Sequence, residues 1–278
     1  MTEFNSTFFE VKRDGPVARL EMNRPDKANS MSPDFWSDLP RLAGELDQDP
    51  TVRCVVLTGA GKHFTGGMDL ATFAEINTML QDEPGRAAFA LRDLILRLQG
   101  ALSSLEELRV PVIAATHGAC LGGGIDLITA CDPRIASEDT IFGIEEIHIG
   151  MAADVGTLQR LPHLIPPAVV HELAYTGRRF SADEARGWGL VSSVHGDRDA
   201  TIEAAMELAH EISQKSPLAI AGIKRAITYS RDHAVGDALE HMATWNAGML
   251  RPEDLVKALT ARTRKQEAVF ADLLKPAV

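Results

Sequence analysis

Three acidic residues, Asp126, Glu146 and Asp154, stand in segments that are otherwise apolar. Carboxylates are seldom buried without a partner, so an acid inside an apolar segment is a candidate for chemistry. Each acid also has a simpler interpretation as a helix cap or a surface charge, because Asp and Glu favour helix starts. Asp154, directly before residues 155–158, fits an N-cap well. The residues alone leave both interpretations open.

Two glycine-rich loops accompany these acids, at residues 59–67 and 122–124. Glycine lets the backbone approach a ligand, and N–H groups at the following helix start can face developing negative charge. Two such N–H groups would form an oxyanion hole. A single loop of this kind more often makes only a tight turn. Two loops with acids close behind them favour a polar site on an apolar scaffold.

The first elements that must position this site are two strands with a helix between them. Residues 17–22 alternate in character, and residues 53–58 form a short apolar run that ends at glycine, so both predict strands. Ser32 can cap the intervening helix, which has Pro33 at its first position and apolar residues at helical spacing.

Further along the chain, residues 86–108 predict a long helix and residues 110–115 predict a buried strand. Past about residue 198 the pattern changes to helix only. The helices are predicted at residues 199–215, 218–230, 233–250 and 252–274. We therefore predict an α/β core with the site at residues 1–198 and a helical region for packing and oligomerisation at residues 199–278.

The composition opposes several classes of function. A formal net charge of −11 opposes nucleic-acid binding, which relies on clusters of Lys and Arg. No stretch of about 20 apolar residues predicts a membrane span, and residues 1–10 lack the regions of a secretory signal. The odd cysteine count of 3 suits reduced thiols better than a disulfide framework. We therefore expect a cytoplasmic protein that binds neither membranes nor nucleic acid.

The sequence does not match the familiar motifs for phosphate binding, metal binding or a serine nucleophile. The loop at residues 59–63 resembles a Walker A motif but has Val56 and His63 where that motif needs Gly and Ser or Thr. The second loop has Cys120 where a dinucleotide fingerprint needs Gly. The nine histidines show no zinc-like spacing, and there is no Gly-x-Ser-x-Gly elbow. Neither metal-based nor serine-based hydrolysis has a candidate.

Three motifs together resemble the crotonase (enoyl-CoA hydratase/isomerase) superfamily. They are HGACLGGGIDL at residues 117–127, FTGGMDL at residues 64–70 and NRPDKAN at residues 23–29. The resemblance implies an α/β core of ββα units wound as a spiral, with a C-terminal all-helical region used in trimerisation. It also implies an acyl-CoA thioester as substrate and a homotrimer or a homohexamer made from two trimers.

By motif position, the resemblance also assigns binding residues. The oxyanion hole that grips the thioester carbonyl would use the backbone N–H groups of Met68 and Gly123. The other substrate-binding residues would be Ala28, Gly66, Gly67, Asp69 and Leu70.

The acids distinguish subfamilies. Hydratases of this superfamily normally carry glutamates at the positions of Asp126 and Glu146, whereas the Δ3,5-Δ2,4-dienoyl-CoA isomerases resemble this chain, with Asp, Glu and an additional Asp at Asp154. Residues 150–162 and 229–233 are similar to the same isomerases. The resemblance implies a proton shift from C2 to C6 of a 3,5-dienoyl-CoA in fatty acid beta-oxidation.

In that reaction, Glu146 would be the base, Asp154 the acid and Asp126 a supporting residue. Glu146 is preferred to Glu145 by motif register alone. No metal or redox cofactor is expected, because coenzyme A is part of the substrate.

Other functions remain as alternatives. An enoyl-CoA hydratase would use the same oxyanion hole, with Asp126 and Glu146 positioning water. A Δ3-Δ2-enoyl-CoA isomerase fits less well, because its short proton shift needs no acid at Asp154. From other classes come a catalytically silent CoA-binding module and an RNA-binding scaffold, for which residues 262–265 offer only a short basic stretch.

Overall fold

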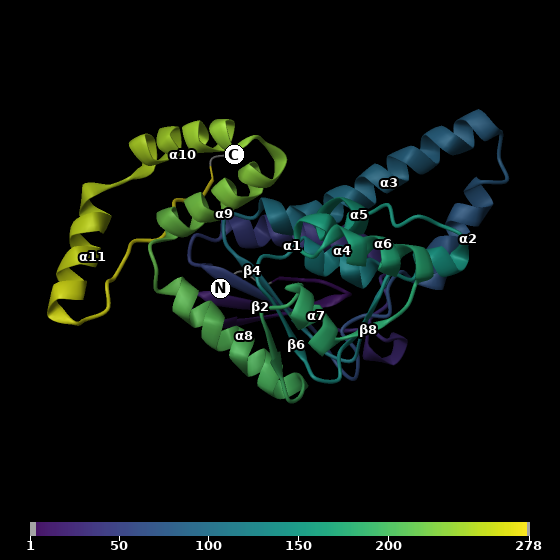
Figure 1. The fold of residues 1–278 in the computed structure, drawn as a ribbon, viewed down its shortest axis with the longest axis horizontal. Coiled ribbons are helices and arrows are strands. Elements are labelled where there is room, and N and C mark those ends of the chain that lie inside the picture. Colours follow the sequence, from purple (N-terminus) through teal and green to yellow (C-terminus); the bar gives the residue numbers. More distant parts are fainter. Residues whose placement is uncertain (1–3, 277–278) are drawn as a thin grey trace.

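The computed structural model describes residues 4–276, apart from the side chains of Leu70, Ala71 and Glu75. Within this part of the chain, six strands form the main sheet in the order β1-β2-β3-β4-β6-β9 (Figure 1). They are β1 (Phe9–Asp14), β2 (Val17–Met22), β3 (Cys54–Gly59), β4 (Val112–Thr116), β6 (Arg134–Ser137) and β9 (Ser193–His195). Only the β1–β2 pair in this sheet is antiparallel.

The main sheet is covered on both faces, as the mostly apolar sequences of its central strands β3 and β4 predict. Side chains alternate across a strand, so Val55 and Leu57 of β3 join the main core, while Val56 points to the opposite face. There it packs in a second cluster that includes Ala205 and Ala209 of helix α8 (Arg198–Ser213).

Helices α1 (Pro33–Gln48) and α3 (Pro84–Glu107) pack together and contribute buried leucines to the main core. The predicted helix with Pro33 at its first position is therefore confirmed. Ser32 occupies the N-cap position as predicted, but its carbonyl accepts from the Phe35 N–H and its side chain accepts no hydrogen bond from the helix amides. In α3, by contrast, the Glu83 side chain accepts from the Gly85 and Arg86 N–H groups and caps the helix.

A small second sheet carries the loop at residues 122–124. It joins β5 (Ala119–Leu121), β7 (Ile141–Gly143) and β8 (Phe180–Ser181). The chain orders β1-β2-α1 and β4-β5-α4 repeat two strands followed by a helix, as predicted for the core. The remaining core helices are α2 (Leu70–Met79), α4 (Gly123–Thr129), α5 (Thr157–Arg160), α6 (Pro167–Thr176) and α7 (Ala182–Trp188), with 3₁₀ turns η1 (Pro25–Lys27), η2 (Glu146–Ile149) and η3 (Leu161–His163).

The C-terminal region is helical, as predicted, and α9 to α11 extend from the core in Figure 1. These helices are α9 (Pro217–Asp232), α10 (Val235–Met249) and α11 (Pro252–Arg264). The last helix ends ten residues earlier than the predicted residue 274, because Lys265 adopts a left-handed conformation with φ of 53° and closes it. The chain then returns to the core, where Arg53 donates to Asp272 and to the Phe270 carbonyl.

The division of the chain after residue 198 stays a prediction, and α8 packs directly on the core sheet. Among the described residues, no helix has the length and apolar character needed to cross a membrane.

Candidate active site

The three acids predicted from the sequence come from three separate pieces of the chain. Asp126 lies on the short helix α4, Glu146 begins the turn η2, and Asp154 lies in the segment before α5. The structure brings them into one electrostatic cluster, because repulsion from Asp126 and from Asp154 each helps to raise the pKa of Glu146. The charges of Asp126 and Asp154 thus influence the ionisation of Glu146, and the catalytic roles of all three acids stay predictions.

Asp126 is 1% exposed and connects two helices, α4 and α5. Its Oδ1 accepts a hydrogen bond of 2.6 Å from the backbone N–H of Thr157, the first residue of α5. Its Oδ2 is buried without a hydrogen-bond partner among the described residues. Burial, and to a smaller degree the charge of Asp154, raise the pKa of Asp126 to about 6. Asp126 therefore ties α4 to α5 while remaining able to gain a proton near neutral pH.

Glu146 has the pKa best suited to a base near neutral pH. Burial first, and then repulsion from Asp126, raise its pKa to about 7. Its Oε2 is buried and finds no hydrogen-bond partner in the described structure. The neighbouring Glu145 instead forms an ion pair of 2.8 Å with Arg179. The structure thus places Glu146, and not Glu145, in the lining of the pocket described next.

A pocket of about 540 Å³ opens beside Glu146. Its walls are mostly apolar and come from η2, the segment before α5, and helix α6. The lining residues are Ile144, Glu146, Ile147, Gly150, Met151, Ala152, Ala153, Leu158, Pro162, Val170, His171, Ala174 and Tyr175. An apolar pocket with one carboxyl group suits a ligand with a hydrocarbon chain and one acidic C–H bond.

Asp154 follows Ala153 of this pocket and is half-buried. Burial raises its pKa above that of an exposed aspartate. The N-cap interpretation of Asp154 is wrong, because Gly156 occupies that position and the Thr157 amide bonds to Asp126 instead. The Asp154 carbonyl accepts a hydrogen bond of 2.6 Å from Gln99 Nε2.

The backbone N–H groups of Met68 and Gly123 are both available for a ligand. Met31 pairs with Met68 in a parallel bridge. The Met31 N–H donates to the Gly67 carbonyl and the Met31 carbonyl accepts from the Asp69 N–H, so the Met68 N–H faces away from Met31. Neither amide donates to a protein acceptor within the described residues. A Cβ placed on Gly123 would lie 4.0 Å from the Met68 nitrogen, so the two predicted oxyanion donors are close to each other.

Glycine is required at position 67 by the same close approach. Its φ of +91° is rarely adopted by other residues. An added Cβ would lie 2.8 Å from the Leu121 carbonyl oxygen and 3.6 Å from the Gly123 nitrogen. Any side chain here would enter the space between the two loops.

The predicted substrate-binding residues of the first loop gather near Ala28. Ala28 adopts a left-handed conformation with φ of 49°, and its carbonyl accepts a bond of 2.7 Å from the Gly66 N–H. Asp69 pairs with Arg24 and accepts from Ser30. The prediction for Leu70 concerns a side chain outside the described part of the structure.

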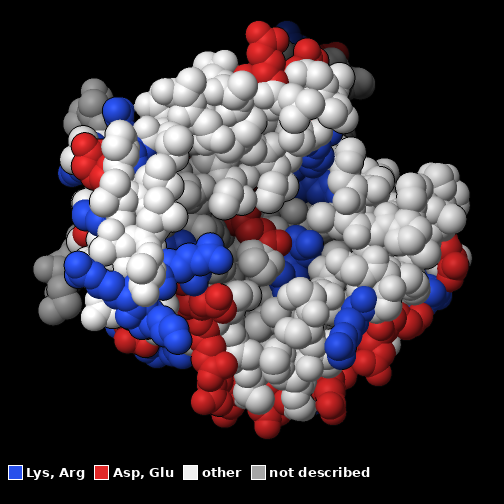
Figure 2. Space-filling model, turned by 60° about the vertical axis from the view of Figure 1, so that its left-hand side comes forward, with Lys and Arg blue, Asp and Glu red and all other residues white. Residues whose placement is uncertain are grey.

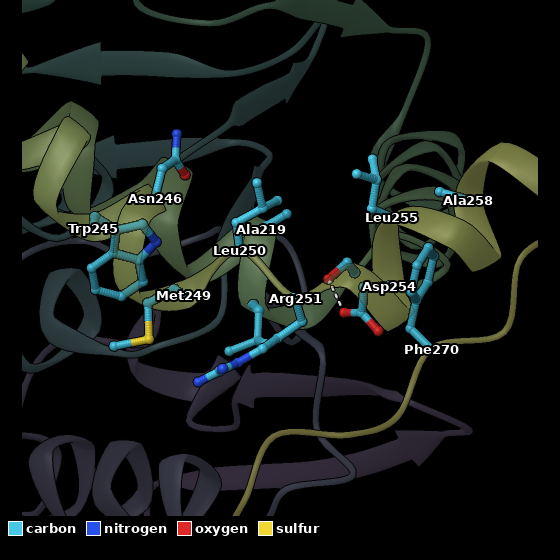
Figure 3. A pocket seen from close by; sticks show the side chains of 12 residues that line it. Ala219, Trp245, Asn246, Met249, Leu250, Arg251, Asp254, Leu255, Ala258 and Phe270 are labelled. Atoms are coloured by element: carbon cyan, nitrogen blue, oxygen red, sulfur yellow. Dashed lines mark hydrogen bonds between the residues drawn. The ribbon is translucent and has the colours of Figure 1, made fainter.

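A second pocket, of about 200 Å³, lies among α9, α10, α11 and the chain after them (Figure 3). Figure 3 shows Trp245 and Met249 of α10, Leu250 directly after it, Leu255 of α11, and Phe270 of the chain that follows α11. None of the predicted catalytic residues lines it. Within the described residues, no group of His, Cys, Asp and Glu side chains is arranged to hold a metal ion.

Sequence reasoning missed two groups that contact the acids, Gln99 and the Thr157 amide. A backbone donor leaves no signal in residue type, so the bond between Thr157 and Asp126 is visible only in the fold. Gln99 lies 55 residues before Asp154 on another element, and its type is ordinary for a helix.

The raised pKa of Asp126 predicts a pH effect on stability. Its folded pKa of about 6 exceeds the value of about 3.9 for an exposed aspartate, so the folded state binds more protons between these values. The free energy of unfolding therefore falls as pH rises through this range. Between about pH 5 and about pH 8, the free energy of unfolding should therefore decrease less in Asp126→Asn than in the unmodified protein, by about 1–2 kcal/mol. Urea unfolding at both pH values tests this, and equal losses in the two proteins would contradict it.

Comparison with known proteins agrees with this geometry. The sequence model of a family described as enoyl-CoA hydratase/isomerase matches residues 12–272. The mitochondrial Δ3,5-Δ2,4-dienoyl-CoA isomerase of Homo sapiens is 46% identical over 90% of this chain and 77% of its own length. The peroxisomal enzyme of that name from Arabidopsis thaliana is 44% identical over 94% of both chains. The crystal structure of an enoyl-CoA hydratase from Bacillus anthracis has a TM-score of 0.86 and 31% identity, over 95% of this chain and 99% of that one.

The expectation of a cytoplasmic location is wrong by the same comparison. The human, rat and mouse relatives are named as mitochondrial, and the Arabidopsis relative as peroxisomal. The expectation depended on cysteine count and on the composition of the first residues, and neither property specifies an organelle.

Proposed function

This chain belongs to the enoyl-CoA hydratase/isomerase family, and we propose that it converts 3,5-dienoyl-CoA to 2,4-dienoyl-CoA in fatty acid beta-oxidation. The observation that carries the proposal is that Asp154 directly follows Ala153, which lines the same pocket as Glu146. A proton that moves from C2 to C6 needs a base at one end of the diene and an acid at the other. The 44–46% identity to the human and Arabidopsis enzymes supports the same assignment.

The reaction begins at C2, where the ionised carboxylate of Glu146 removes a proton. The electron pair of that C–H bond forms the C1=C2 double bond of an enolate, while the electron pair of the thioester C=O bond moves onto oxygen and the double bonds at C3 and C5 stay in place. The Met68 and Gly123 amides donate to the thioester oxygen as it becomes negative. Removing one donor of an oxyanion hole typically costs ~10²- to 10³-fold in rate.

The reaction ends at C6, which takes a proton from Asp154. The double bonds then stand at C2 and C4, in conjugation with the thioester. The two acids must start in opposite protonation states. Burial raises the pKa of both, and the charge of Asp154 raises that of Glu146 further, so the state in which both are ionised is disfavoured. Asp126 assists by repulsion, which raises the pKa of Glu146 further. These steps require no cofactor beyond the coenzyme A of the substrate.

The test uses two substrates with separate readouts. The protein is incubated with a 3,5-dienoyl-CoA while conjugated-diene absorbance is followed, and with a 2-enoyl-CoA while loss of enoyl absorbance is followed. Diene formation is the expected result. Hydration without diene formation would contradict the isomerase proposal and indicate a hydratase. The relatives at 44–46% identity are named as isomerases, so they do not support a hydratase.

We also propose that the chain assembles as a trimer, or as a hexamer of two trimers. Helices α10 and α11 leave large apolar residues exposed, including Val235 at 77% and Leu239 at 67%. Exposed apolar patches of this kind mark interaction surfaces. Figure 2 brings forward the side of the molecule on which α10 and α11 lie in Figure 1, and broad areas of this face carry no charged residues. Sedimentation should give three or six times the chain mass of 30.1 kDa, and a monomer at micromolar concentration would contradict the proposal.

A further inference from the structure

Three polar residues of α3, Gln99, Ser103 and Glu106, hold the segment that carries Asp154. Their spacing of four and three residues places them on one face of the helix. Gln99 Nε2 donates to the Asp154 carbonyl at 2.6 Å. Farther along, Ser103 Oγ accepts from Arg160 Nη2 at 2.9 Å, and Glu106 pairs with Arg160 at 3.4 Å. The segment from Asp154 to Arg160 is therefore attached to α3 at both ends.

The contacts between α3 and residues 154–160 continue to two further elements, α9 and α4. Glu106 also pairs with Arg231 of α9, which fixes this end of α3 against the C-terminal helices. Inside the segment, the Thr157 amide bonds to Asp126 at 2.6 Å. The position of α3 thus determines where Asp154 stands relative to the other acids.

We propose that Gln99 is a positioning residue for the isomerisation, because its bond to the Asp154 carbonyl keeps the side chain of Asp154 directed at C6. This inference rests on the proposed function. Gln99 acts through the backbone, so it holds Asp154 without consuming the hydrogen-bonding capacity of the carboxyl group. Its amide is also neutral, whereas a cation at this place would favour the ionised form of Asp154 and oppose its role as an acid.

The first test replaces Gln99 with methionine, which has similar size but no N–H group. A misplacement of about 1 Å can cost on the order of 10²-fold in rate, so kcat for diene formation should fall ~10- to 100-fold. KM should change little, because the pocket lining does not include Gln99. Exchange of the C2 proton with deuterium from solvent should persist, because that step uses Glu146. The matched control is Gln159→Met, an exposed glutamine of the same surface groove, which should behave as the unmodified protein.

A second variant, Gln99→Lys, restores a donor and adds a charge. It should recover much of kcat at the maximum of its own pH profile, and the alkaline limb of its kcat profile should move to lower pH. The sign follows because Asp154 acts while protonated and a nearby cation lowers its pKa. This pH shift separates positioning from a general loss of stability.

The outcomes distinguish this inference from the proposed function. If the unmodified protein forms no diene, both are overturned. If it forms the diene and Gln99→Met matches it in kcat, only the role of Gln99 is overturned. The role is likewise overturned if Gln99→Met loses C2 exchange and diene formation in parallel.

Discussion

Replacing Asp154 with asparagine is expected to lower the rate of 2,4-dienoyl-CoA formation ~10²- to 10⁴-fold, the range typical for loss of a general acid. Asparagine has nearly the same shape, and its backbone carbonyl can still accept the hydrogen bond from Gln99. Its side-chain amide is too weak an acid to protonate C6, so the enolate should form and then return to substrate. The measurement is diene absorbance, combined with deuterium incorporation at C2 of the recovered substrate.

Retained exchange at C2 in Asp154→Asn would assign Asp154 to the second half of the reaction. The control is Asp199→Asn, because the side chain of Asp199 is 90% exposed and lies outside the acidic cluster. Loss of C2 exchange together with diene formation would contradict the assignment, because it would make Asp154 the base.

The prediction from sequence succeeded where one residue pattern is tied to one physical cause. The apolar spacing of α1 predicts a buried face, and Phe35, Leu39 and Leu42 are all fully buried. The mostly apolar β3 and β4 predict strands covered on both sides, and every residue of both is buried. These patterns are local, so they can be read without knowing the rest of the fold.

The candidate site was predicted less completely, because its geometry depends on contacts between distant segments. Adjacent acids such as Glu145 and Glu146 have the same side chain, and only the ion pair of Glu145 with Arg179 shows which one turns away. Asp154 resembled a helix cap because it precedes α5, yet the amide it would have capped bonds to Asp126. The competing partner lies 31 residues from Thr157 in the chain, beyond the reach of a capping rule.

Replacing Glu146 with glutamine is expected to lower the rates of both C2 exchange and diene formation, each by ~10²- to 10⁴-fold. Glutamine fills the same volume in the pocket but cannot accept the C2 proton. In the unmodified protein, the exchange rate should fall as pH drops below about 7, because the base must be ionised and burial raises its pKa to about 7. In Glu146→Gln, this pH limb should disappear along with the rate.

The matched control for Glu146→Gln is Glu145→Gln, which makes the same chemical change one residue away. Glu145 pairs with Arg179, so its loss should leave the C2 exchange rate near neutral pH unchanged. The acidic limb should stay and move only slightly to lower pH, because the charge of Glu145 is the smallest contribution to the raised pKa of Glu146. The two acid variants then differ in kind: Glu146→Gln stops the reaction before the enolate, and Asp154→Asn stops it afterwards. If Glu145→Gln instead removed the exchange, the base would be Glu145, and its ion pair with Arg179 would have to open for catalysis.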